Sequence, residues 1–324
     1  MQTITFHSYL SPEIDRFVEL RRLSGTNYSS QARLLMYFDR FLIEQYPNEL
    51  SITRHITDHY LQSISHLHPR SQFNRFSVVR QLCRYIAQKD PCCHIPEAMK
   101  CITASKAFYP HIFGKQEITN LLSAASTLQP HESLRPHTYQ TLFGLLYTTG
   151  IRIGEAFSLT LKDFNPEREL LYIAKGKFRK ARWIPLHPTT SHSLNQYIER
   201  RLRTGTRVPE SPLFVNLRAQ HLCHCTVYET FRQLLEKCGI PHNKRTGPRI
   251  HDFRHTFAVH RLLAWYQNKQ DVNIMLPALA TYMGHVCIAS THVYLHPTAE
   301  LLEQVNNRFH NHYLRNLKTK GGKS

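Results

Sequence analysis

Arginine and histidine side chains occur in two short motifs that suit the binding of a phosphate group. In "TTGIRIGEAFSLTLKDF" Arg152 precedes Glu155 by three residues, and in the later stretch "HDFRH" His251 precedes Arg254 by three. Residues three apart in a helix share a face, so His251 and Arg254 can address one anion together, whereas His255 is expected to point differently. A guanidinium stays charged at any working pH and offers forked donors to phosphate oxygens. Taken alone, each motif also fits a surface ion pair or a basic helix lying along a nucleic-acid backbone.

Two further stretches contain a lysine-rich turn and a lone tyrosine. "AKGKFRKARWIPL" places Lys175 and Lys177 in a turn between two segments typical of strands, and "MGHVCIASTHVYLH" contains His285 and, nine residues later, Tyr294. A phenol has a pKa near 10 and becomes a useful nucleophile only when its proton moves or nearby cations favour the phenolate. Taken alone, the turn is compatible with a purely electrostatic role and the tyrosine with a packed core residue.

Taken in order, the four stretches resemble the tyrosine recombinase (phage integrase) family. The order is Arg-x-x-Glu, a lysine in a hairpin, His-x-x-Arg, Gly-His and a tyrosine nine residues on, and the match spans roughly residues 108 to 310. Small departures, such as Phe253 where leucine is more usual, remove no reacting group. The N-terminal part is similar to the family's core-binding domain in architecture only.

The resemblance implies a set of reacting side chains and one supporting carboxylate: Arg152, Lys177, His251, Arg254, His285, Tyr294 and Glu155. The two arginines would clamp the scissile phosphate, the two histidines would donate to its oxygens, and the tyrosine would be the nucleophile. His251 is also a candidate to accept the phenolic proton. Lys177, eight residues before Pro185, would protonate the departing 5′ oxygen, with Lys175 as the alternative.

The implied activity is that of a site-specific recombinase or integrase, which cleaves and rejoins DNA strands through a 3′-phosphotyrosyl intermediate. Its role would be integration or excision of a mobile element, or resolution. Fixed cations would neutralise the phosphate, so neither a metal nor another cofactor is expected. The implied partners are double-stranded DNA and further copies of the chain in a homotetramer, with a C-terminal helix at 298–314 docking on a neighbour. The alternatives are a type IB topoisomerase-like enzyme and a catalytically silent DNA-binding regulator of the same fold.

Charge and composition agree with a polyanionic partner. The formal net charge is +18, from 41 Lys and Arg against 23 Asp and Glu, whereas solubility needs about 2 to 8 charges. No run approaches the roughly 18 apolar residues of a spanning helix, and no signal peptide is recognisable, so we expect a cytoplasmic protein without membrane association. The eight cysteines are then expected to be reduced thiols. The clusters "CCH" at 92–94 and "HLCHC" at 221–225 lack the paired spacing of a zinc site.

The elements that must position these residues are mainly α-helical with a small antiparallel sheet. Residues 1–107 predict a helical core-binding (DNA-binding) domain, and residues 108–324 a mixed α/β catalytic domain with a C-terminal helix and a basic tail. In the first domain, Ser11 is expected to cap a helix, and the helix near 28–46 to bury Leu34, Tyr37, Phe38 and Phe41. In the second, helices are expected at 115–126, 252–266 and 271–283, and strands at 169–175 and 181–186.

Overall fold

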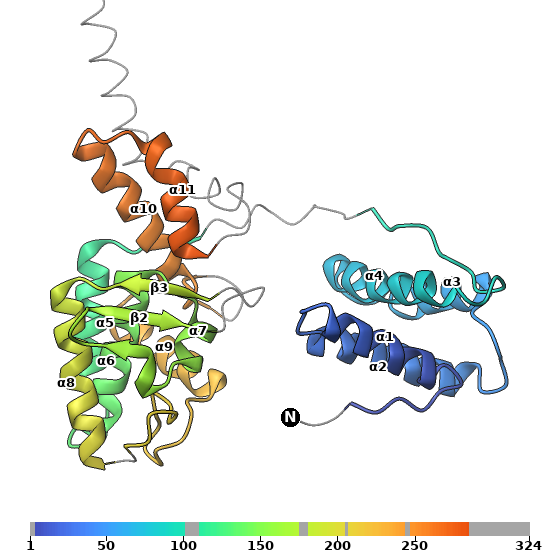
Figure 1. Cartoon of the computed structure of the whole chain (residues 1–324), viewed down its shortest axis with the longest axis horizontal. Coiled ribbons are helices and arrows are strands. Elements are labelled where there is room, and N and C mark those ends of the chain that lie inside the picture. Colours follow the sequence, from blue (N-terminus) through green and yellow to red (C-terminus); the bar gives the residue numbers. More distant parts are fainter. Residues whose placement is uncertain (1–3, 101–109, 175–180, 205–206, 244–246, 285–324) are drawn as a thin grey trace, which may run out of the picture. The chain divides into compact units, whose positions relative to one another are not determined.

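The computed structural model describes residues 4–100, 110–174, 181–204, 207–243 and 247–284. The chain divides into two compact units, Met1–Phe108 and Tyr109–Ser324, and each is considered by itself. Figure 1 shows helices alone in the first unit and helices around a small sheet in the second. The predicted fold class is confirmed.

The first unit contains four helices within its described residues, each with an apolar side turned to a common core. They are α1 (Ser11–Leu23), α2 (Ser29–Gln45), α3 (Arg54–Ser63) and α4 (Pro69–Ile86). Ile14, Phe17 and Val18 of α1 are buried. The predicted cap at Ser11 is wrong: Ser11 is the first helical residue, Leu10 occupies the cap position, and no side chain caps this end.

The buried face of α2 differs from the predicted one. Of the four residues expected inside, only Phe38 is buried, and Tyr37 is 41% exposed. The smaller side chains of Ala32, Leu35 and Leu42 line the core instead, together with Asp39. The Asp39 carboxylate accepts hydrogen bonds from two backbone N–H groups, at 2.9 and 3.0 Å, of the segment before α1. The Asp39 carboxylate can lie in this core because both of its oxygens are hydrogen-bonded there.

The second unit is built from helices that pack on a central helix, α6, half of whose residues are buried. Its helical segments are α5 (Lys115–Ser126), α6 (Leu134–Thr149), α7 (Ile153–Ser158), η1 (Leu161–Asp163), α8 (Pro188–Thr204), α9 (His224–Lys237), α10 (Asp252–Gln267) and α11 (Val272–Met283). Helices α5, α8 and α10 all pack on α6. Figure 1 shows α10 and α11 side by side at one end of this unit, where they share a separate apolar cluster.

The sheet has three antiparallel strands in the order β1-β2-β3. They are β1 (Phe164–Asn165), which the sequence did not predict, β2 (Leu170–Ile173) and β3 (Arg182–Pro185). Leu171 pairs with Ile184, and Ile173 with Arg182. Since side chains alternate across a strand, Arg182 lies on the same face as buried Ile184 and is turned toward the interior.

Candidate active site

The turn between α6 and α7 is shaped by Gly150. This residue ends α6 in the left-handed conformation, with φ of 61°, and its N–H donates to the Leu146 carbonyl at 2.9 Å. A Cβ at this position would lie 2.9 Å from Cγ of Phe257 on α10, closer than real contacts allow. The chain can therefore turn this tightly against α10 only with glycine, and the turn brings Arg152 to the cap position of α7.

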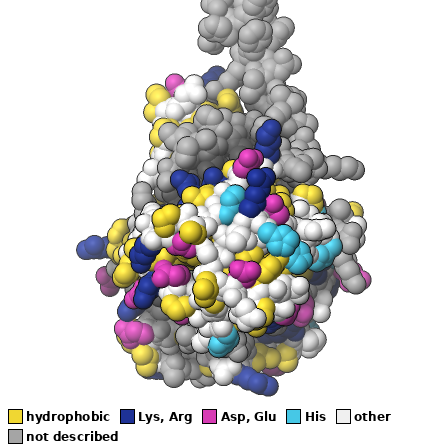
Figure 2. Space-filling view, turned by 90° about the vertical axis from the view of Figure 1, so that its right-hand side faces the viewer, with side chains coloured by type: hydrophobic (Ala, Val, Ile, Leu, Met, Phe, Trp, Pro, Cys, Tyr) yellow, Lys and Arg dark blue, Asp and Glu magenta, His cyan; other side chains and the backbone are white. Residues whose placement is uncertain are grey.

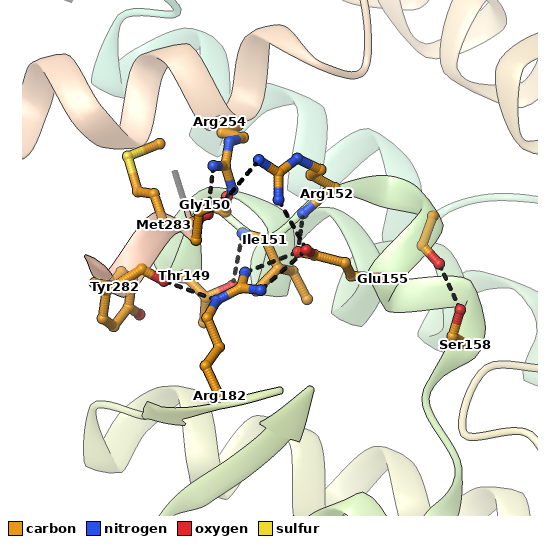
Figure 3. A network of polar contacts seen from close by, with 12 residues as sticks. Thr149, Gly150, Ile151, Arg152, Glu155, Ser158, Arg182, Arg254, Tyr282 and Met283 are labelled. Atoms are coloured by element: carbon orange, nitrogen blue, oxygen red, sulfur yellow. Dashed lines mark hydrogen bonds and ion pairs between the residues drawn. The ribbon is translucent and has the colours of Figure 1, made fainter. Parts of the chain in front are cut away.

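Glu155 is the carboxylate around which two arginines are arranged (Figure 3). It is 4% exposed, and its oxygens accept from the Arg152 backbone N–H at 2.9 Å and from the Arg152 side chain at 2.9 Å. Arg182 donates from both terminal nitrogens, at 3.0 and 2.8 Å. Burial alone would raise the pKa of Glu155, but the bonds from Arg182 and the Arg152 backbone, and both positive charges, lower it to about 2. The carboxylate is therefore ionised at neutral pH.

Arg254 is held at the start of α10 by aromatic packing around its neighbour. Phe253 stacks against Phe113 and Phe143, with ring centroids 5.1 and 5.5 Å apart. Phe253 thus fills the core beside α6. Arg254 itself is 2% exposed and donates to the carbonyl oxygens of Gly150, at 2.7 Å, and of Met283, at 2.6 Å.

The C-terminal end of α11 is where the three arginines meet (Figure 3). Its last carbonyls, at Tyr282, Met283 and Gly284, accept from Arg182 Nε at 2.9 Å, Arg254 at 2.6 Å and Arg152 at 3.4 Å, respectively. The carbonyls at a helix C-terminus have no partner within the helix and lie at the negative end of its dipole. Three guanidiniums against one carboxylate leave a net charge of +2 at this point. An anion is therefore favoured there.

His251 is the cap residue of α10 and is exposed at its surface. Its ring lies edge-on to that of His255, with ring centroids 5.0 Å apart. His255, which was expected to point in a different direction, therefore contacts His251. The pKa of His251 is lowered to about 4, mainly by partial burial and further by the nearby His255 and the charges of Arg254 and Arg249. The imidazole is consequently neutral at pH 7 and able to accept a proton.

Four predicted site residues, Lys175, Lys177, His285 and Tyr294, lie outside the described residues, as does the predicted helix at 298–314. The structure does place the residues that flank them. Arg182 follows Lys177 by five positions, and Gly284 directly precedes His285. Among the predicted residues that are described, Arg152, Glu155 and Arg254 are brought together by hydrogen bonds, directly or through the end of α11.

Arg182 is the site residue that the sequence analysis missed. The signal was available in the strand pattern, because Arg182 stands two residues before Ile184 and must share its buried face. An arginine at an inward position of a short strand needs a buried anionic or carbonyl partner, and Glu155 and Tyr282 supply both.

Neither a metal site nor a membrane-spanning helix is found within the described part of the chain. There, no group of three or more His, Cys, Asp and Glu side chains lies together in a way that would hold a metal ion. In the same residues, no helix is long and apolar enough to cross a membrane.

The Phage integrase family matches residues 112–300, more than half of the chain. The putative integrase/recombinase y4rB of Sinorhizobium fredii is 34% identical over 304 residues, covering 91% of this chain and 95% of the relative. Tyrosine recombinase XerD of Listeria innocua is 28% identical over 245 residues, covering 75% of this chain and 76% of the relative.

A solved structure, the Tn1549 transposon integrase in complex with transposon right end DNA, has the same fold with a TM-score of 0.65 at 15% identity, covering 92% of this chain and 99% of that one. The family match extends over the region that contains all four motifs. From its motifs, its fold and these relatives, the chain belongs to the phage integrase family, that of the tyrosine recombinases.

Proposed function

We propose that this protein is a site-specific recombinase that cleaves and rejoins DNA strands through a covalent 3′-phosphotyrosyl intermediate, with Tyr294 as the nucleophile. The observation that carries the proposal is the meeting of Arg152 and Arg254 on the carbonyls of Gly284 and Met283. The chain that continues from Gly284 enters His285 at once and reaches Tyr294 ten residues after the glycine. The charged pair therefore lies where this segment begins.

In the proposed reaction the Tyr294 oxygen forms a bond to phosphorus as the bond from phosphorus to the 5′ oxygen breaks. The phenolic proton goes to His251, and Lys177 (or Lys175) gives a proton to the departing oxygen. Negative charge on the two non-bridging oxygens is stabilised by Arg152 and Arg254. Reversal of these steps by a DNA hydroxyl reseals the strand, so the bond energy is conserved and no nucleotide cofactor is consumed.

His251 is neutral at pH 7, because its pKa is lowered to about 4, so its ring can accept the phenolic proton, although the same shift makes it a weaker base than an ordinary imidazole. An imidazole that is already protonated at neutral pH would be unable to take the phenolic proton, whereas this one is neutral. His251 is also exposed, so that its ring is accessible from outside the helix that holds it.

Double-stranded DNA is the proposed partner, in a homotetramer on two synapsed sites, and the cytoplasm the proposed location. The net charge of +18 supports a polyanionic partner. In the first unit the helices carry exposed arginines that suit a phosphate backbone: Arg16, Arg22, Arg33, Arg40, Arg54, Arg70 and Arg84. The face in Figure 2 has Lys, Arg and His side chains interspersed with acidic ones, so binding is expected through separate basic positions rather than a uniform basic surface. The names of relatives, integrase and transposon integrase among them, favour integration or excision of a mobile element.

The decisive experiment traps the covalent intermediate on nicked duplex fragments that cannot religate. The full chain should form an adduct that survives denaturation, and Tyr294→Phe should form none. Tyr228→Phe, which alters an exposed tyrosine on α9, is the matched control and should react as the parent does. Sequencing the trapped DNA identifies the site. Strand exchange between two such sites then separates a recombinase from an enzyme that only relaxes supercoils. Absence of any adduct on DNA that the protein still binds would refute the recombinase proposal in favour of a DNA-binding regulator.

A further inference from the structure

Two buried cysteines of the first unit lie against each other, and the reaction as proposed gives them no part. Cys83 belongs to the last turns of α4 and is 0% exposed, and Cys93 follows the end of that helix by seven residues and is 5% exposed. The Sγ of Cys93 donates to the carbonyl oxygen of Cys83 at 3.7 Å, and a hydrogen bond also joins the two thiol groups. Both are free thiols. Their sulfur atoms are therefore neighbours within one core.

The turn that follows α4 fixes the place to which Cys93 returns. The N–H of Asp90 donates to the Ile86 carbonyl at 2.9 Å, and the N–H of Cys93 donates to the Asp90 carbonyl at 3.1 Å. The Asp90 carboxylate accepts from the Cys92 N–H at 2.9 Å and from the Ser51 hydroxyl at 2.7 Å. Because these bonds hold the turn closed, the two thiols lie together without a covalent link.

The two thiols differ in acidity and in exposure, which gives each a separate role. Their mutual hydrogen bond is the main cause of opposite shifts in pKa, upward for Cys83 and downward for Cys93. Since the thiolate rather than the thiol reacts with oxidants, Cys93 is the sulfur that reacts first. It is also the more exposed of the two. Cys83 is then the neighbouring thiol that can react with the oxidised sulfur.

We propose that Cys83 and Cys93 form an oxidant-responsive dithiol, which hydrogen peroxide converts into a disulfide within the first unit. The Cys93 sulfur forms a bond to one peroxide oxygen as the O–O bond breaks, giving a sulfenic acid and, with the proton that Cys93 gave up, one water. The Cys83 sulfur then forms a bond to the Cys93 sulfur as the S–O bond breaks, and the proton of Cys83 leaves with the oxygen as a second water. Two thiols are oxidised, and one peroxide is reduced to two water molecules.

The disulfide would tie the segment after α4 to the helix by a covalent bond. In the reduced protein that segment is held by hydrogen bonds alone, among them those from Arg80 Nε to the Pro96 carbonyl at 2.8 Å and from the His94 N–H to the Ile52 carbonyl at 2.7 Å. A disulfide stabilises a fold mainly because it restricts the unfolded chain. Oxidation should therefore raise the urea midpoint of the first unit by about 1 M. The inference is independent of the recombinase chemistry, since neither thiol belongs to the candidate site of the second unit.

The test treats the full chain with hydrogen peroxide, alkylates the remaining thiols and locates linked cysteines by mass spectrometry after digestion without reductant. A pair of peptides joined through Cys83 and Cys93 is expected, and dithiothreitol should separate it. Cys92→Ala is the matched control: it removes the exposed thiol next to Cys93 and should form the same link as the parent. Cys83→Ala in that background should form no link and should leave Cys93 as a sulfenic acid that dimedone labels.

Two results in the parent protein would overturn the proposal, so the test does not depend on how well the variants fold. One is a link made through Cys92, or between two chains, while Cys83 can still be alkylated. The other is oxidation of the exposed cysteines, 92, 223 and 225, while Cys83 and Cys93 both remain thiols. The stability of the linked protein is followed by hydrogen exchange of peptides from α4 at increasing urea, which reports on the first unit alone. An unchanged midpoint would contradict the expected stabilisation.

Discussion

Replacing Glu155 by glutamine keeps the shape of the side chain and removes the negative charge that Arg152 and Arg182 share. The carboxylate is 4% exposed, so solvent screens these contacts little. Its pKa is about 2 in the folded protein against an ordinary 4.5. At about 1.4 kcal/mol per pKa unit, the difference corresponds to about 3 kcal/mol of folding stability. We therefore expect Glu155→Gln to lower the free energy of unfolding at pH 7 by about that amount.

The expected loss depends on pH in a defined direction. Because the folded pKa of Glu155 lies below its unfolded value, the carboxylate's contribution is fully present above pH 4.5 and disappears as the pH falls toward 2. The difference between parent and variant should thus shrink from about 3 kcal/mol at pH 7 to about 2 kcal/mol at pH 3.5. Urea titration is the suitable assay, since urea is uncharged and does not screen ion pairs.

Tryptophan fluorescence reports on the relevant unit alone. The chain has two tryptophans, Trp183 and Trp265, and both lie in the second unit. Glu210→Gln is the matched control, because Glu210 pairs with Lys162 at 3.2 Å in a contact where both side chains are more than half exposed. Its unfolding midpoint should equal that of the parent. An unchanged midpoint for Glu155→Gln at pH 7, or a deficit that does not decrease at pH 3.5, would refute the reasoning.

Three further outcomes are expected. Gly150→Ala should destabilise the second unit by about 3 kcal/mol, because alanine is strained in the left-handed conformation and its Cβ would overlap Phe257. Gly154→Ala is the control and should not destabilise it, because the space around its Cβ is open; equal unfolding midpoints for the two variants would contradict this. At subsaturating DNA, where the rate reports the groups of the free protein, the cleavage rate should be nearly the same at pH 5.5 and 7, because His251 with a pKa of about 4 is neutral at both; a decline centred near pH 6.5 would contradict this. DNA affinity should fall steeply with salt as counterions are released, and a flat plot of log affinity against log salt would argue against backbone binding.

The positions of the helices were predictable because local signals set them. The spans 115–126, 252–266 and 271–283 agree with α5, α10 and α11 to within one residue at each end. Gly150 is a local signal of the same kind, since a glycine readily adopts the left-handed conformation that ends α6. Strand β1 was not predicted, because it has only two residues and so shows no alternation of apolar and polar side chains.

Which face of a helix is buried was less predictable. On α2 the sequence favours the largest apolar side chains, yet Tyr37 is exposed, and the core takes Ala32 and Leu35, which permit close packing. Asp39 is inside because backbone donors from a segment thirty residues away reach it. Such a partner is determined by the tertiary structure and cannot be predicted from the residues around Asp39 in the sequence.

In the candidate site too, some features follow from local sequence and others only from tertiary contacts. Motif spacing singled out Arg152 and Arg254 as candidates, and both bond to carbonyls at the end of α11, but the contact between His251 and His255 depends on ring orientation, which spacing does not specify. Arg182 was overlooked because its importance comes from Glu155 and from the end of α11, two elements far from it in sequence.

The end of α11 explains why arginine, rather than any cation, is found at these positions. The carbonyls of Tyr282, Met283 and the cap residue Gly284 are each bonded to a different guanidinium, contributed by β3, by α10 and by the cap residue of α7, respectively. A guanidinium carries five N–H donors in a plane, so it can complete a helix end and still present donors in another direction, which an ammonium group does less well. The helix end fixes the three arginines relative to one another before any DNA arrives. Positive charge that is already in place needs no rearrangement when negative charge develops on a phosphate, and this is the condition under which electrostatic catalysis is most effective.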